Sequence, residues 1–175
     1  NAVKVNGAAA DDEAKWEDFL GNTGLLFFDD KNDANKEKGV AFTVQMPHAW
    51  KEGSTIYPHV HWSAKVAPGA ERVYWALEYT WVNLAGTFPA TTTIKSNSLA
   101  TPNGTSISAY EHVITPLGSI TATGKTLSSM LVCRLYRNSS DNTNDTFDSE
   151  KAGLLEIDFH YQIDSDGSNE EYSKW

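Results

Sequence analysis

The stretch Arg72-Val73-Tyr74-Trp75-Ala76-Leu77-Glu78-Tyr79-Thr80-Trp81-Val82 decides the fold. Large apolar side chains stand at every second position from Val73 to Trp81, and the positions between them are on the whole smaller or more polar. Successive side chains of a strand point to opposite faces, so this period of two predicts a strand with one buried face. A helix would spread the same five positions around its axis.

The same alternation recurs in two later stretches, Met130–Arg137 and Leu154–Ile163. In the first, Leu131, Cys133 and Leu135 are predicted to share the buried face. In the second, the predicted inward side chains are Leu155, Ile157, Phe159, Tyr161 and Ile163, and the predicted outward ones are Glu156, Asp158, His160 and Gln162. Shorter runs rich in β-forming residues predict strands at Leu25–Phe28, Val40–Met46, Thr55–Ala64, Thr87–Ile94 and Tyr110–Thr115.

Eight or nine short strands with almost no helix predict an all-β protein. Their irregular spacing and the long polar loops favour a two-sheet β-sandwich of jelly-roll type. Residues 25–175 are predicted to form this single domain, and residues 1–24 an extended N-terminal arm with a short helical turn between Asp11 and Leu20. The predicted core contains Trp75, Leu77, Tyr79, Leu135, Ile157 and Phe159.

Composition excludes several classes of protein. The 175 residues carry a net charge of −9, which disfavours contact with nucleic-acid phosphates. No apolar run approaches the roughly 18 residues that span a membrane. The single cysteine, Cys133, leaves no intramolecular disulfide, and its place on an apolar strand face predicts an inert core thiol.

His59 and His61 are the most chemically suggestive residues. On the strand predicted at Thr55–Ala64 they share a face with Tyr57 and Ser63, about 7 Å apart along the strand. Gly53, five residues and then His-x-His are similar to the opening of the cupin metal motif, which also belongs to a jelly roll.

That motif needs a glutamate near position 65 or 66, where this chain has Lys65 and Val66. His112 or His160 could supply a third imidazole, but the sequence does not place either one. The prediction is therefore a structural histidine pair with no metal and no cofactor; His59, His61 and His160 are the candidates if an ion is bound.

The remaining polar patterns have ordinary explanations. Asp164–Asn169 resembles part of a calcium loop but lacks the terminal acid of an EF-hand, so we expect a turn. Glu78 and Arg134 are predicted to form a cross-strand ion pair if their strands are neighbours. Glu78, Glu156 and Asp158 leave open a carboxylate pair for glycoside hydrolysis. No nucleophile elbow, phosphate loop or dinucleotide fingerprint occurs, so we predict no catalytic residues and no enzyme activity.

Four stretches, taken in order along the chain, form a more specific pattern than any single motif above. They are VQMPHAW at 44–50, PHVHW at 58–62, VYWALEY at 73–79, and LEIDFHYQID at 155–164 followed by Gly167. Together they resemble a family of small virion proteins of tailed bacteriophages, over residues 40–168. No catalytic residues are carried over from this resemblance.

The resemblance implies a structural, non-enzymatic protein of the virion, assembled in the host cytoplasm. The leading expectation is a capsid decoration, or cement, protein that stabilises the head as a homotrimer bound to the major capsid protein. A tail- or fibre-associated module that binds a receptor or carbohydrate is the alternative, followed by a cupin-type metal-binding protein. Residues Asn1, Ala2, Val3, Lys4 and Val5 of the arm are the suspected subunit contacts, and neither nucleic acid nor membrane is an expected partner.

Overall fold

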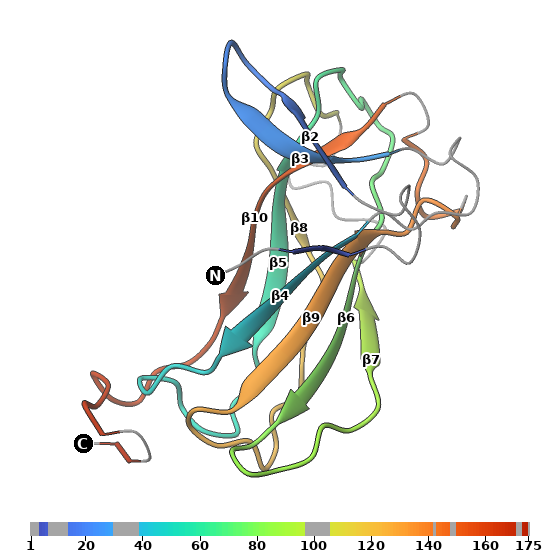
Figure 1. The fold of residues 1–175 in the computed structure, drawn as a ribbon. Coiled ribbons are helices and arrows are strands. Elements are labelled where there is room, and N and C mark those ends of the chain that lie inside the picture. Colours follow the sequence, from blue (N-terminus) through green and yellow to red (C-terminus); the bar gives the residue numbers. More distant parts are fainter. Residues whose placement is uncertain are drawn as a thin grey trace.

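A computed structural model describes residues 4–6, 14–29, 39–96, 106–141, 143–147, 150–170 and 173–174. The described residues form ten strands and no helix (Figure 1). The strands are β1 (Lys4–Asn6), β2 (Lys15–Asp18), β3 (Gly24–Phe28), β4 (Gly39–Gln45), β5 (Tyr57–Ser63), β6 (Trp75–Val82), β7 (Thr92–Lys95), β8 (Val113–Pro116), β9 (Met130–Arg137) and β10 (Ala152–His160). No helix in this part of the chain is therefore a candidate for crossing a membrane.

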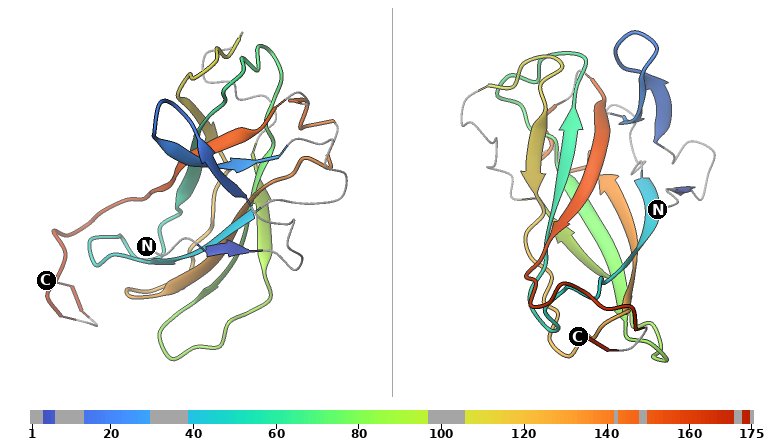
Figure 2. Two further views of the ribbon diagram at one scale, coloured as in Figure 1. Left: turned by 45° about the horizontal axis from the view of Figure 1, so that its top comes forward. Right: turned by 90° about the vertical axis from the view of Figure 1, so that its left-hand side faces the viewer.

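The strands make two five-stranded antiparallel sheets. The first sheet has the order β1-β4-β9-β6-β7, and the second has the order β2-β3-β10-β5-β8. The right-hand view of Figure 2 shows β8, β5 and β10 as one layer beside the layer that contains β9 and β6. From β3 onward the chain crosses repeatedly between two four-stranded layers, 3-10-5-8 and 4-9-6-7, which is a jelly-roll arrangement. The predicted β-sandwich is confirmed.

The core lies between the sheets and is built from the predicted alternation. Trp75, Leu77 and Leu135 of the first sheet are fully buried, as predicted, and Val60 and Trp62 of the second sheet face them. The rings of Phe28 and Trp75 meet edge to face at 5.0 Å. The predicted core residues Tyr79, Ile157 and Phe159 are only partly buried, although they pack against the same cluster.

Strand β9 has the predicted bounds, but β6 begins at Trp75 rather than at Arg72. Residues that follow β9 form hydrogen bonds with backbone groups that a longer β6 would have paired with a neighbouring strand. The Arg72 carbonyl accepts from the amides of Thr146 and Phe147, and the Tyr74 carbonyl accepts from Asn138.

The predicted helical turn between Asp11 and Leu20 is wrong where the structure describes it, because Lys15–Asp18 is strand β2. It pairs in register with β3, with Trp16 opposite Leu26. β1 also lies within residues 1–24 and pairs with the edge of β4, with Val5 opposite Val40. Parts of the N-terminal stretch therefore extend both sheets, while Asn1, Ala2 and Val3 lie outside the described residues.

A β-bulge corrects the predicted faces of the last strand. Leu154 pairs with Trp62 and Glu156 pairs with His61, so Leu155 has no partner on β5. Leu154 packs against the core instead of Leu155, which is 41% exposed. β10 ends at His160, so Tyr161 and Ile163 lie beyond it and are exposed, contrary to prediction.

Candidate functional site

The outer face of the second sheet gathers most of the chain's histidines. β5 lies between β10 and β8, and its core-facing residues alternate with His59 and His61. The β10 register places Asp158 opposite His59 and His160 opposite Tyr57. The bulge lies before these residues, so they keep the predicted outward face.

Four of the five histidines form a connected cluster on this face. The Nε2 atoms of His59 and His61 are 2.8 Å apart, and Nδ1 of His61 is 2.7 Å from Nε2 of His112. The His160 ring lies 4.5 Å from the His59 ring. The fold thus brings both of the histidines that the sequence could not place, His112 and His160, to the predicted pair.

The tautomer of His61 is coupled to its two neighbours: whichever ring nitrogen of His61 carries the proton donates, and the other accepts from the ring that it faces. A neutral imidazole carries one N–H and one lone pair on its two nitrogens. When Nδ1 of His61 donates to His112, Nε2 of His61 presents its lone pair toward His59. His112, which directly precedes β8, therefore orients the His61 ring.

Asp158 supplies a carboxylate that sequence reasoning had placed on the outward face but had not joined to the pair. Its Oδ2 lies 3.7 Å from Nε2 of His59 and 3.8 Å from Nε2 of His160. One ligand atom from each of His59, His61 and Asp158 lies within 4.8 Å of the other two. The signal missed in the sequence was Asp158-x-His160 on a strand that pairs with His59-x-His61.

Burial and charge keep His59 neutral. Burial lowers the pKa of His59, and the nearby imidazoles of His160 and His61 lower it further, against the opposing effect of the Asp158 carboxylate. A neutral imidazole is the form that accepts a hydrogen bond or binds a metal ion. At neutral pH His59 is therefore available as an acceptor or a ligand.

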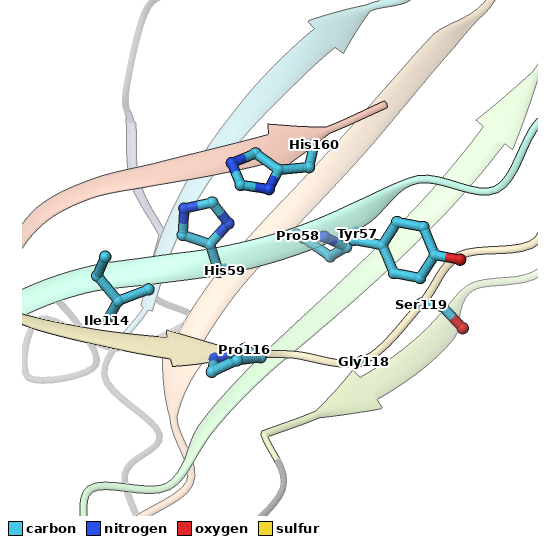
Figure 3. Close-up of a pocket in the computed structure, with 8 residues that line it drawn as sticks. All are labelled: Tyr57, Pro58, His59, Ile114, Pro116, Gly118, Ser119 and His160. Atoms are coloured by element: carbon cyan, nitrogen blue, oxygen red, sulfur yellow. The ribbon is translucent and has the colours of Figure 1, made fainter. Parts of the chain in front are cut away.

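A depression of about 530 Å³ lies beside the cluster (Figure 3). In Figure 3, His59 and His160 face one another from β5 and β10, with Pro116 of β8 on the other side of His59. The depression is lined by Tyr57, Pro58, His59, Ile114, Pro116, Gly118, Ser119 and His160. Solvent or a small ligand can therefore reach the imidazoles of His59 and His160 from this depression.

The predicted pair of Glu78 and Arg134 is confirmed at 3.8 Å, on the outer face of the first sheet. Glu78 is consequently on the opposite side of the sandwich from Glu156 and Asp158. The sheets separate these groups, so Glu78 cannot join either acid in a two-carboxylate glycosidase site.

Two other sequence candidates have structural roles. Cys133 is buried in the core, and burial raises the pKa of its thiol to about 12, so it is not a nucleophile at neutral pH. The stretch from Asp164 onward forms the predicted turn, in which Gly167 has a φ of 105°. Asp164 is paired with Lys174, and Ser165 Oγ donates to the His48 carbonyl at 3.3 Å.

An apolar groove of about 620 Å³ is the second feature with functional potential. It lies where β4 of the first sheet faces β3 and β10 of the second. Trp16 of β2 lines the groove and is 71% exposed. Leu155, the bulge residue of β10, and Tyr161 also line the groove. Its lining residues are Trp16, Leu25, Leu26, Val40, Phe42, Val44, Gln45, Pro47, Leu154, Leu155, Glu156, Ile157, Asp158, Phe159 and Tyr161. The alternation in the sequence did not indicate this surface, because it predicts Leu155 and Tyr161 to be inside.

Comparison of the chain with protein-family models, with curated proteins and with solved structures found no match.

Proposed function

We propose that the chain is a non-enzymatic structural protein of a tailed-bacteriophage virion, and specifically a decoration protein on the outside of the capsid. It works as a homo-oligomer, most simply a trimer, and binds the major capsid protein. The resemblance over residues 40–168 supports the virion assignment. The apolar groove carries the proposal that the protein works through subunit contacts.

The groove has the composition of a contact surface. Trp16, Leu155 and Tyr161 are large apolar or aromatic side chains that stay substantially exposed along its lining. Each Å² of apolar surface removed from water contributes about 25 cal/mol, and aromatic residues are enriched at the centres of interfaces. Covering this groove with another subunit therefore offers a driving force for assembly.

The N-terminal arm gives a second contact. β1 pairs with the edge of β4, and β4 also lines the groove. An edge strand presents backbone groups that pair readily with another chain. Strand β1, a described part of the arm, is the edge strand of the first sheet, which supports a role for the arm in joining subunits there.

The net charge of −9 fits an outer layer better than a lumen filled with DNA, because phosphates would repel it. The high pKa of the buried Cys133 thiol argues against a cysteine nucleophile, and the position of Glu78 argues against a carboxylate pair that includes it. A structural role therefore accounts for these residues without invoking an active site.

Light scattering of the purified chain tests the assembly step. The expected wild-type mass is three times that of the chain, and Leu155→Glu is expected to give monomers because it places a charge in the groove. Leu84→Glu is the matched control, since Leu84 is equally apolar, exposed and outside the groove. A monomeric wild type, or equal dissociation in both variants, would contradict the groove as the contact.

Electron microscopy of capsids decorated with the purified protein tests the location. The expected result is regular extra density on the outer capsid surface, lost with Leu155→Glu. Density on tails alone would replace the decoration role with the tail or fibre role. Binding to neither structure would refute the virion assignment.

A further inference from the structure

We propose that His59, His61 and Asp158 bind one divalent transition-metal ion on the outer face of the second sheet, with His160 beside the open side of the site. This goes beyond a structural role in a virion, which needs no metal. The sequence alone favours a structural histidine pair, because the strand that carries the pair has no carboxylate at the expected spacing. The register of β10 supplies that carboxylate.

The distances suit one ion. Two ligand atoms bound side by side at about 2.0–2.1 Å from Zn²⁺ lie roughly 3.0–3.4 Å apart. The Nε2 atoms of His59 and His61 are 2.8 Å apart, so the pair needs to widen by only a few tenths of an ångström. A carboxylate oxygen of Asp158 lies within 4.8 Å of a ring nitrogen of each histidine, and the Asp158 side chain is half-exposed.

Hydrogen bonding alone accounts for only part of this arrangement. It explains the short contact between His59 and His61, in which one ring donates to the other. Asp158 Oδ1 accepts from the Phe159 amide at 2.7 Å, whereas Oδ2 stands between His59 and His160 at 3.7 and 3.8 Å, beyond hydrogen-bond length from either but within ion-pair distance. These distances exceed the roughly 3.0–3.4 Å between neighbouring ligands of one Zn²⁺ ion, so Oδ2 would move inward by a few tenths of an ångström when the ion binds.

The surroundings hold the ligands in place. His59 and His61 are two residues apart on β5, an interior strand paired on both sides, and Asp158 is fixed opposite His59. Metal-binding histidines usually use their second ring nitrogen for a hydrogen bond that orients the ring. His112 makes this contact with Nδ1 of His61 at 2.7 Å.

The donor set selects the class of ion. Two imidazoles with one carboxylate suit Zn²⁺, Co²⁺, Ni²⁺ or Fe²⁺, whereas Ca²⁺ and Mg²⁺ prefer oxygen ligands alone. The side chain of His160 is largely exposed and can rotate to add a third nitrogen. Solvent from the adjoining depression can fill the remaining positions.

Calorimetric titration of the chelator-treated full chain with ZnCl₂ tests the site. The expected result is one ion per chain for the wild type, and loss of measurable binding in His59→Gln and in His61→Gln. Asp158→Asn is expected to weaken binding at least about 10-fold. His48→Gln is the matched control, because His48 contacts Ser128 and lies outside the cluster.

His112→Gln separates orientation from ligation. It is expected to weaken Zn²⁺ binding about 10–100-fold while leaving the visible absorption spectrum of the Co²⁺ complex unchanged, since the ligands themselves remain. Circular dichroism establishes that each variant is folded; Asp158→Asn, at a half-exposed position, provides a second folded test of the site. The proposal is wrong if the wild type binds no stoichiometric Zn²⁺, or if Asp158→Asn and His59→Gln bind it as tightly as His48→Gln does.

Discussion

Arg137 and Asp145 form an ion pair that is completely buried at one end of the core. Nε and Nη2 of Arg137 donate to the two carboxylate oxygens at 2.8 and 2.7 Å, and Asp145 also accepts the Tyr74 amide. The guanidinium further donates to the carbonyls of Phe147 and Glu150. One residue thereby ties the loop after β9 to the sandwich.

Replacing Arg137 should therefore be costly. Arg137→Met leaves a buried, unpaired carboxylate, so we expect the free energy of unfolding to fall by about 3–5 kcal/mol. Arg134→Met, at the more exposed pair with Glu78, should lose about 1 kcal/mol or less. Urea denaturation measures both. If Arg137→Met/Asp145→Leu is no more stable than Arg137→Met alone, the unpaired charge is not the cause.

Phe28 and Phe159 are the same residue type but differ in burial, so their alanine variants show how burial affects the free energy of unfolding. Phe28 is fully buried, so Phe28→Ala should cost about 3–5 kcal/mol. Phe159 is partly buried and meets Phe42 edge to face at 6.4 Å, so Phe159→Ala should cost about 2 kcal/mol. Chemical denaturation compares the two, and equal losses would contradict the difference in packing.

At the scale of elements, the bulge in β10 decides what lies on each face of the second sheet. It places Leu154 inside and Leu155 outside, and from Glu156 onward it restores the pairing that brings Asp158 to His59. Without Leu155, β10 would pair with the same residues of β5 in a regular, uninterrupted ladder.

Deleting Leu155 tests this account. Leu154 and Glu156 already pair with the neighbouring residues Trp62 and His61, so the deletion should cost about 1 kcal/mol or less. Deleting Ile157 instead removes a paired residue, and closing the gap shifts Glu156 toward the core. A loss of several kcal/mol is expected there, because a one-residue slip exchanges the faces. Similar denaturation midpoints for both deletions would contradict the assigned register.

For the whole molecule, Glu17 links β2 to the rest of the second sheet. The Glu17 carboxylate forms an ion pair with Lys151, just before β10. It forms a second ion pair with Lys65, just after β5, in which Lys65 Nζ is 3.4 Å from Glu17 Oε2. Lys151 also pairs with Asp29 at 3.6 Å. Burial alone would raise the pKa of Glu17, but the hydrogen bonds and charges of Lys151 and Lys65 outweigh it and lower that pKa.

This linkage predicts a pH dependence of stability. A carboxylate with a lowered folded pKa stabilises the fold above the unfolded pKa of 4.5, and that contribution is lost as the pH falls through the folded pKa. Glu17→Gln should therefore lose less stability than the wild type between pH 6 and pH 3. Urea midpoints across this range measure the difference, and parallel curves would contradict the role of Glu17.

Several features were fixed by the local sequence. The alternation around Trp75 and Leu77 determined that β6 is a strand with one buried face. Successive side chains along a strand point to opposite faces, so this pattern can be read from consecutive residues. The same local rule determined the bounds of β9 and placed Cys133 in the core. It also placed His59 and His61 together on one face of β5, because they are two residues apart.

Only the tertiary structure decided which strands became neighbours and in what register. Sheet neighbours are chosen by packing between distant parts of the chain, so the sequence could not show that β10 brings Asp158 and His160 to His59, or that β8 brings His112 to His61. The bulge at Leu155 and the pairing of β2 with β3 were set in the same way. The histidine pair was visible in the sequence; its carboxylate came from register, which is a property of the folded sheet.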